Sequence, residues 1–203
     1  MKTFTKKLLG IVYACGVIYV RNRRHLPVLL NARGLTGQGA EIGVSRGTFS
    51  EQILQVWQGR KLFSVDPWKE FSQDEYRDIT NVQQKSQEAY YTETKARLAG
   101  FGERSCIWRM TSAEAANKFE NRQLDFVYID AQHHYEAVKE DISLWFPKLR
   151  QGGVLSGHDY VDGRFEEGEF GVKSAVDEFV AFKKLKLHVT SDPSFPSWFV
   201  FIH

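Results

Sequence analysis

The chain has little of what marks several large classes of protein. Its 203 residues include two cysteines, Cys15 and Cys106, so neither a disulfide framework nor a cysteine-based metal cluster is expected. Lys and Arg number 27 against 25 Asp and Glu, whereas nucleic-acid-binding domains usually carry a clear basic excess. Repeats and low-complexity segments are absent from the sequence. These absences favour one globular domain that acts on a small molecule and binds no nucleic acid.

A short apolar run near the N-terminus is the exception to this globular pattern. Residues 8–20 lie between two lysines and the basic residues 21–24, but a membrane-spanning helix needs about 20 apolar residues. The run predicts a helix within an N-terminal extension, residues 1–34, that precedes a domain over residues 35–203. This helix would pack on the domain or on a partner subunit, which leaves a homodimer open. A membrane-associated anchor and a cleaved signal peptide are the alternatives, and we otherwise expect a cytoplasmic protein.

Beyond residue 34, strand-like and helix-like segments alternate, which predicts an α/β fold. Strands are expected over residues 40–44, 61–65, 105–110, 124–129, 154–156, 185–190 and 197–202, and helices over residues 48–57, 68–98, 135–146 and 171–182. Residues 48–51 and 111–114 have the spacing of helix capping boxes. The last two strands are too close in sequence for a parallel crossover, so they should be antiparallel. The sequence thus predicts a Rossmann-like, doubly wound sheet of seven strands with an antiparallel last strand.

Polar residues follow each of the first five expected strands. In doubly wound sheets, ligands bind at the carboxyl ends of the strands. The turn EIGVSRG over residues 41–47 lets the backbone approach a ligand closely, and Asp66 stands where a carboxylate binds ribose hydroxyls. The later strands are followed by Thr111 and Ser112, by Asp130, Gln132, His133 and His134, and by His158, Asp159 and Tyr160. Each residue alone is explained by a turn or a helix cap, but together they predict a binding site.

Three segments resemble class I S-adenosylmethionine-dependent methyltransferases. They are EIGVSRG, FSVDPW and residues 125–160, DFVYIDAQHHYEAVKEDISLWFPKLRQGGVLSGHDY. The last segment resembles the signature IDAxHxY…GGxxxGHDY of bacterial small-molecule O-methyltransferases. The resemblance covers about residues 38–202. It implies a seven-stranded sheet with an antiparallel last strand, S-adenosylmethionine as cofactor, and transfer of its methyl group to the hydroxyl of a small-molecule acceptor.

The resemblance also implies roles for individual residues of the cofactor site. Those matched to the family are Glu41, Gly43, Ser45 and Gly47 at the methionine end, Asp66 at the ribose, Ser112 along the adenine and Asp130 near the sulfonium. Ser45 replaces a glycine found in many relatives, and we expect only a modest effect because serine is small.

Some related O-methyltransferases place a divalent metal across the ends of the fourth and fifth strands. Since neighbouring strands lie roughly 4.8 Å apart, Asp130, His158 and Asp159 are the expected ligands of Mg²⁺ or a similar ion. The imidazole favours a borderline metal over Mg²⁺, and whether a metal binds is left open. Gln132 stands where metal-dependent sugar relatives have a carboxylate base. His133 or His158 is therefore the expected catalytic base, with His133 preferred because it matches the family's histidine position.

Two alternatives to methyl transfer remain open. One is a nucleotide-dependent oxidoreductase on a Rossmann sheet, although no G-x-G-x-x-G follows the first strand. The other is a non-catalytic, membrane-tethered scaffold that has kept the fold. Acceptor binding is expected from an acidic, mobile loop over residues 162–171, which favours a neutral or cationic acceptor. The connection after the second strand, residues 68–98, carries Trp68, Tyr76, Tyr90 and Tyr91, which either line the pocket as well or pack as ordinary helix residues.

Overall fold

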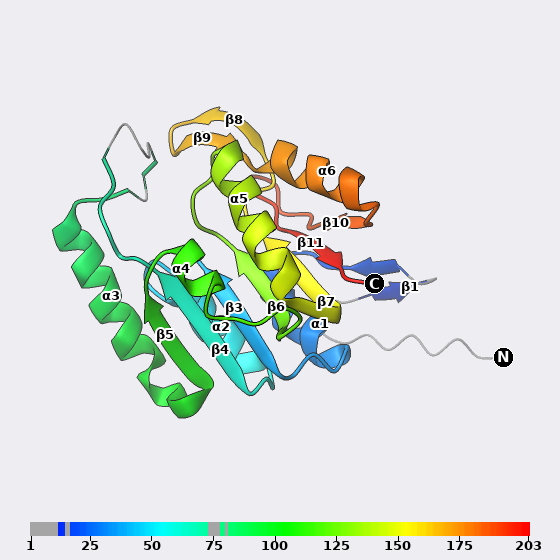
Figure 1. Ribbon diagram of the computed structural model, residues 1–203, viewed down its shortest axis with the longest axis horizontal. Helices are drawn as coiled ribbons and strands as arrows, with labels where there is room; N and C mark the ends of the chain where they lie inside the picture. The colour runs from blue at the N-terminus through cyan, green and yellow to red at the C-terminus, as the bar shows by residue number, and fades with distance from the viewer. Residues whose placement is uncertain (1–11, 15–16, 73–77, 80) are drawn as a thin grey trace.

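The computed structural model describes residues 12–14, 17–72, 78–79 and 81–203. Its centre is a seven-stranded sheet with the order β10-β11-β7-β6-β3-β4-β5 (Figure 1). The strands are β3 Gln38–Ile42, β4 Lys61–Asp66, β5 Ser105–Arg109, β6 Leu124–Ile129, β7 Leu149–Gly157, β10 Leu187–Val189 and β11 Trp198–Phe201. β11 runs antiparallel to both of its neighbours, and the other pairs are parallel. The predicted fold class and the antiparallel last strand are confirmed.

Helices pack on both faces of this sheet and bury one apolar cluster on each. One cluster takes residues from α1 Leu26–Ala32, α2 Thr48–Val56 and α3 Gln84–Leu98, and the other from α4 Ser112–Ala116, α5 Tyr135–Trp145 and α6 Val172–Lys183. β6 serves both, because Phe126 and Tyr128 face the first cluster while Val127 and Ile129 face the second. This explains the almost continuous apolar sequence of that strand. Short 3-10 helices cover η1 Arg23–His25, η2 Ala99–Arg104 and η3 Phe146–Lys148.

The apolar N-terminal run does not form the expected helix where it is described. Two short strands, β1 Val12–Ala14 and β2 Val17–Tyr19, pair antiparallel, and the rest of the run up to residue 16 lies outside the described residues. Val, Ile and Tyr dominate these segments and favour extended backbone. Further along, Leu29 and Leu30 of α1 are fully buried in the first cluster, so this part of the chain packs as part of the domain. None of the helices in the described ranges is long and apolar enough to cross a membrane.

Two connections near the carboxyl ends of the strands also differ from the predictions. The helix expected over residues 68–98 begins only at Gln84. Ahead of it, the Asn81 side chain bonds the backbone N–H and C=O of Phe71 at 2.9 and 3.0 Å. The acidic segment is an antiparallel hairpin of β8 Asp162–Phe165 and β9 Gly168–Gly171 rather than a loop. Asp78 bridges Gly168 of this hairpin, so the two connections meet.

Candidate active site

A cavity of about 590 Å³ lies at the carboxyl ends of the parallel strands, beside the switch point between β3 and β6. Its volume is within the range of small-molecule sites, roughly 300–1,000 Å³. The predicted site residues on its wall are Glu41, Gly43, Ser45, Asp66, Ser112, Asp130, His133, His158 and Asp159. Gly47 does not line the cavity. A Cβ at that position would instead meet Thr94 of α3 at 3.0 Å.

The turn between β3 and α2 forms the floor of the cavity, and one position of this turn requires a glycine. Gly43 has φ +85°, and a Cβ there would lie 2.0 Å from the carbonyl oxygen of Asp130. Backbone hydrogen bonds fix the chain just beyond the strand ends. The N–H of Gly43 donates to the C=O of Val65 at 2.9 Å, and the N–H of Asp130 donates to the C=O of Ile42 at 2.7 Å. Ser45 also adopts a left-handed conformation, with φ +50°.

Asp66 organises the same turn. One of its carboxylate oxygens accepts the backbone N–H groups of Val44 and Ser45, both at 2.9 Å, and the other accepts that of Trp68 at 2.7 Å. Burial raises the pKa of Asp66 above its ordinary value, and these three bonds oppose the rise. A carboxylate offers about four acceptor positions, so one remains for a ligand. The arrangement is compatible with the predicted contact to a ribose.

Glu41 is the most buried charged group of the cavity wall, with 1% of its surface exposed. Its carboxyl accepts a hydrogen bond from the Ser50 hydroxyl, which in turn lies 2.8 Å from the Ser64 hydroxyl. Burial raises the pKa of Glu41 to about 8, although the bond from Ser50 opposes the shift. At neutral pH this carboxyl is therefore mostly protonated, and a neutral carboxyl can donate as well as accept a hydrogen bond.

A second buried carboxyl lies beyond the end of β5. Ser112 donates a hydrogen bond to Asp141 and accepts one from the Trp145 indole at 2.8 Å. Burial raises the pKa of Asp141 to about 7, with the bond from Ser112 acting against it. Since Ser112 and Asp141 both line the cavity, the predicted adenine end has a polar group of variable charge.

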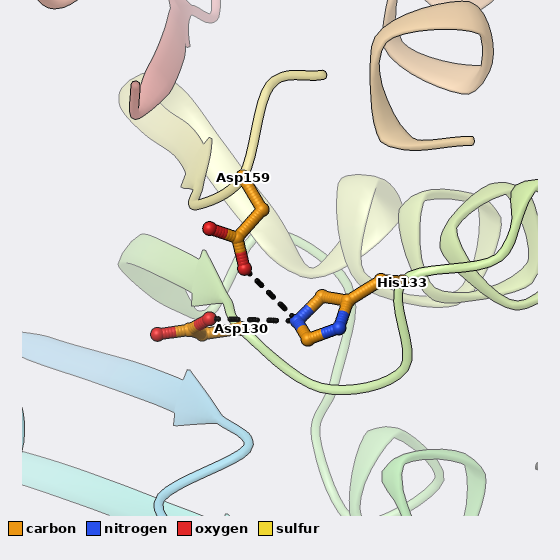
Figure 2. Close-up of side chains that lie close together, drawn as sticks. All are labelled: Asp130, His133 and Asp159. Carbon is orange, nitrogen blue, oxygen red and sulfur yellow. Dashed lines mark ion pairs between the residues drawn. The ribbon is translucent and has the colours of Figure 1, made fainter. Parts of the chain in front are cut away.

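His133 is the centre of an acidic cluster at the other end of the cavity (Figure 2). Its Nε2 lies 3.0 Å from Asp159 and 4.0 Å from Asp130, and its Nδ1 lies 2.8 Å from Asp78. The ring stacks on Phe170 of the β8–β9 hairpin, with centroids 4.6 Å apart. Burial acts to lower the pKa of His133, but the bonds to Asp159 and Asp78 outweigh it and raise the pKa to about 10. In this arrangement the ring is a cation at neutral pH, with both nitrogens engaged.

His158 and Asp159 complete this cluster. Nδ1 of His158 lies 2.5 Å from Asp159 and 3.9 Å from Asp130. Burial acts to raise the pKa of Asp159, yet the bonds from His133 and His158 hold it well below its ordinary range. Asp130, His133 and Asp159 each present one ligand atom, and these atoms lie within 4.8 Å of one another. The structure thus brings His133, as well as the predicted His158, to the two predicted metal-binding carboxylates.

Three residues that the sequence analysis missed contribute to the cavity or to the acidic cluster. Arg23 lines the cavity and donates to Asp130 at 3.0 Å, and no local pattern could have revealed a contact across 107 residues. Asp78 lies in a polar segment without periodicity. Asp141 had a usable signal: it falls at helical spacing among Val138, Ile142 and Trp145, so a carboxyl on an apolar face marked an unusual site.

The aromatic residues expected to line the cavity do not do so where they are described. Trp68 is fully buried and donates its indole N–H to Ser45 at 2.7 Å, Tyr91 packs against Trp68, and Tyr90 packs under Arg46. Tyr76 lies outside the described residues. The second connection and α3 instead place other residues on the wall, namely Lys69, Phe71, Asn81 and Gln87.

The methyltransferase domain family matches residues 40–160, more than half of the chain. The chain belongs to this methyltransferase family. The match begins in β3 and ends just after Asp159, so it contains every predicted site residue. It confirms that the enzyme is a methyltransferase, as predicted, and decides against the oxidoreductase alternative.

The methyltransferase is also similar to individual proteins. It is 27% identical over 154 residues to the uncharacterized protein y4gI of Sinorhizobium fredii, covering 76% of this chain but only 16% of that protein's length. Among solved structures, an O-methyltransferase from Bacillus cereus in complex with SAH has a TM-score of 0.61 at 13% identity, with 89% and 80% of the two chains covered. The O-methyltransferase TomG of Streptomyces achromogenes, in complex with SAM, has a TM-score of 0.59 at 13% identity, with 89% and 79% covered. These structures support the fold.

Proposed function

We propose that this methyltransferase transfers a methyl group from S-adenosylmethionine to the hydroxyl of a small molecule. The observation that carries the proposal is one cavity in which the predicted cofactor residues of β3, β4 and β5 meet the acidic cluster at the ends of β6 and β7. Cofactor and acceptor can therefore bind side by side. S-adenosylmethionine supplies an electrophilic methyl group on a sulfonium. The O-methyltransferases with similar folds agree with a hydroxyl acceptor.

The chain itself has to align the acceptor and remove its proton. We assign the base to His158 rather than to His133, on geometry. Nδ1 of His158 bonds Asp159 at 2.5 Å, which fixes the ring and leaves Nε2 for the acceptor hydroxyl. Both nitrogens of His133 are already engaged by carboxylates, and a cationic ring cannot take up a further proton.

The acidic cluster also has the donors for a divalent metal. Once a metal displaces the proton on Nε2 of His133, Asp130, His133 and Asp159 offer two carboxylates and one imidazole within 4.8 Å, a mixed set that suits Mn²⁺ or Zn²⁺ better than Mg²⁺. The bond from the other nitrogen of His133 to Asp78, 2.8 Å long, matches the carboxylate that commonly orients a metal-binding histidine. A bound metal would lower the pKa of the acceptor hydroxyl.

The first experiment measures binding and then turnover. Calorimetry should show binding of S-adenosylmethionine and S-adenosylhomocysteine but not of NAD, and NAD binding alone would refute the proposal. Transfer of a labelled methyl group is then measured with neutral and cationic hydroxyl compounds, and with their amine analogues as matched controls. Cofactor binding without transfer to any hydroxyl would favour the non-catalytic scaffold.

A second experiment addresses the metal. Exhaustive chelation should abolish turnover, and Mn²⁺ should restore it in the native protein but not in Asp159→Asn. Full turnover after chelation would remove the metal from the proposal while leaving methyl transfer intact.

A further inference from the structure

Arg23 is a cation on the cavity wall that comes from outside the part of the chain matched by the family. η1 places it there, before the first strand of the main sheet. Two groups fix its guanidinium: Asp130 accepts from Nη1 at 3.0 Å, and the ring of Phe49 lies 5.0 Å from Cζ. A charged side chain so well held at a ligand site needs an explanation.

We propose that Arg23 binds the α-carboxylate at the methionine end of S-adenosylmethionine, an inference that rests on the proposed function. The position of Arg23 supports this end of the ligand. Its partners Phe49 and Asp130 belong to the start of α2 and the end of β6, around the turn formed by Gly43. The predicted adenine end lies elsewhere, because Ser112 follows β5, which is three strands away from β6 on its β3 side, and Asp141 of α5 bonds Ser112.

The charges at this position also match the ligand. An amino-acid group carries one carboxylate and one ammonium, and the wall presents one guanidinium and one carboxylate 3.0 Å apart. The guanidinium has five N–H donors, and the bond to Asp130 uses one of them. With 36% of the side chain exposed, donors remain for a carboxylate. Because the ring of Phe49 already holds the guanidinium, little side-chain entropy is lost on binding.

The two other basic residues of the wall are less suited to this role. Arg46 is turned toward α3, where it pairs with Glu93 at 3.5 Å and packs on Tyr90. Lys69 extends over Phe71 in the second connection, with its Nζ 5.4 Å from the ring centre. Among the residues that the structure describes, neither is paired with a carboxylate of the cavity wall, so neither forms the paired charges that an amino-acid group requires.

The test compares two ligands that differ only in the carboxylate. Calorimetry measures the affinities of the native protein, Arg23→Gln and Arg23→Lys for S-adenosylmethionine and for decarboxylated S-adenosylmethionine. Arg23→Gln should weaken S-adenosylmethionine by roughly 10- to 100-fold and change the affinity for the decarboxylated compound little. Arg23→Lys should recover part of the loss. Arg24→Gln is the matched control, because Arg24 is an exposed neighbour that does not line the cavity.

An equal effect on both ligands, or none on either, would overturn the inference, because Arg23 would then only neutralise Asp130. If Arg23→Gln fails to fold, the same comparison in Arg23→Lys decides, since lysine keeps the charge but loses the bidentate geometry. If the native protein binds neither ligand, the proposed function fails together with the inference. If it binds both with equal affinity, only the inference fails.

Discussion

Replacing Asp141 by asparagine should stabilise the methyltransferase in alkaline solution and destabilise it in acid. The carboxyl is 6% exposed and bonded to Ser112. Burial raises its pKa to about 7 from an ordinary value of 3.8. Between these two values the folded chain keeps a proton that the unfolded chain releases, so this group makes the free energy of unfolding fall as the pH rises. Asparagine cannot ionise, which removes this contribution.

The size of the effect follows from the same shift. A rise in pKa from 3.8 to about 7 corresponds to about 4 kcal/mol in favour of the neutral carboxyl. Asparagine keeps an oxygen that can accept from Ser112 but buries new N–H donors, at a cost of about 1–3 kcal/mol. At pH 8 the variant should therefore be more stable by about 1–3 kcal/mol. At pH 4.5 the unfolded carboxyl is already largely ionised, so the variant should be less stable by about 2 kcal/mol or less.

Urea denaturation at a series of pH values measures this difference directly. The free energies of unfolding of Asp141→Asn and the native protein should cross between pH 4.5 and pH 8. Glu136→Gln is the matched control, because it removes an exposed carboxylate of the same helix and should leave the two curves parallel. Parallel curves for Asp141→Asn as well would refute the reasoning, since they would mean that Asp141 ionises normally in the folded protein.

Three further predictions concern Gly43 at the cavity floor, the proposed base His158 and the helix cap at Thr111. Gly43→Ala should lower the free energy of unfolding, measured by thermal or urea denaturation, by about 3 kcal/mol or more, because Gly43 has a positive φ and a new Cβ would collide with Asp130. The control is Gly100→Ala, whose Cβ meets nothing within 4 Å and which should change stability by less than about 1 kcal/mol. His158→Gln should lower kcat about 10²- to 10⁴-fold and flatten its pH profile, with cofactor affinity and the control His134→Gln unchanged; an unaltered profile would return the base to another residue. Thr111→Ala should cost about 1 kcal/mol, measured in urea, because Thr111 and Glu114 form a complete capping box.

Much of the sheet could be predicted because each parallel strand has local signals. The strand over residues 124–129 is correct at both ends, since a fully buried strand needs an apolar residue at every position. The antiparallel last strand followed from the length of one connection. The capping box at residues 111–114 is confirmed, while the one at 48–51 is wrong because Gly47 is the N-cap. There Glu51 pairs with Arg97 at 2.8 Å instead.

The parts that could not be predicted depend on contacts between distant segments. The apolar N-terminal run has no periodicity that separates helix from strand. The acidic hairpin needs its own cross-strand pairing and its bridge to Asp78, and neither can be recognised locally. The positions of the strand ends correctly predicted that Asp130 and Asp159 lie in one cluster. The division of roles between His133 and His158 could not be predicted, because it depends on which nitrogen meets which carboxylate.

The backbone hydrogen bonds around the cavity predict two rates of amide hydrogen exchange, slow at the cavity floor and fast at the β8–β9 hairpin. The N–H groups of Gly43, Asp130 and His158 donate to strands of the main sheet at 2.7–3.0 Å, so we expect their hydrogen exchange to be slow. On the opposite side, Ile79 N–H donates to Glu167 of the hairpin at 2.9 Å. This bond joins two surface segments and can open locally. Amide exchange should therefore be fast at Ile79 and slow at the floor, which retains the alignment of the reacting groups between turnovers.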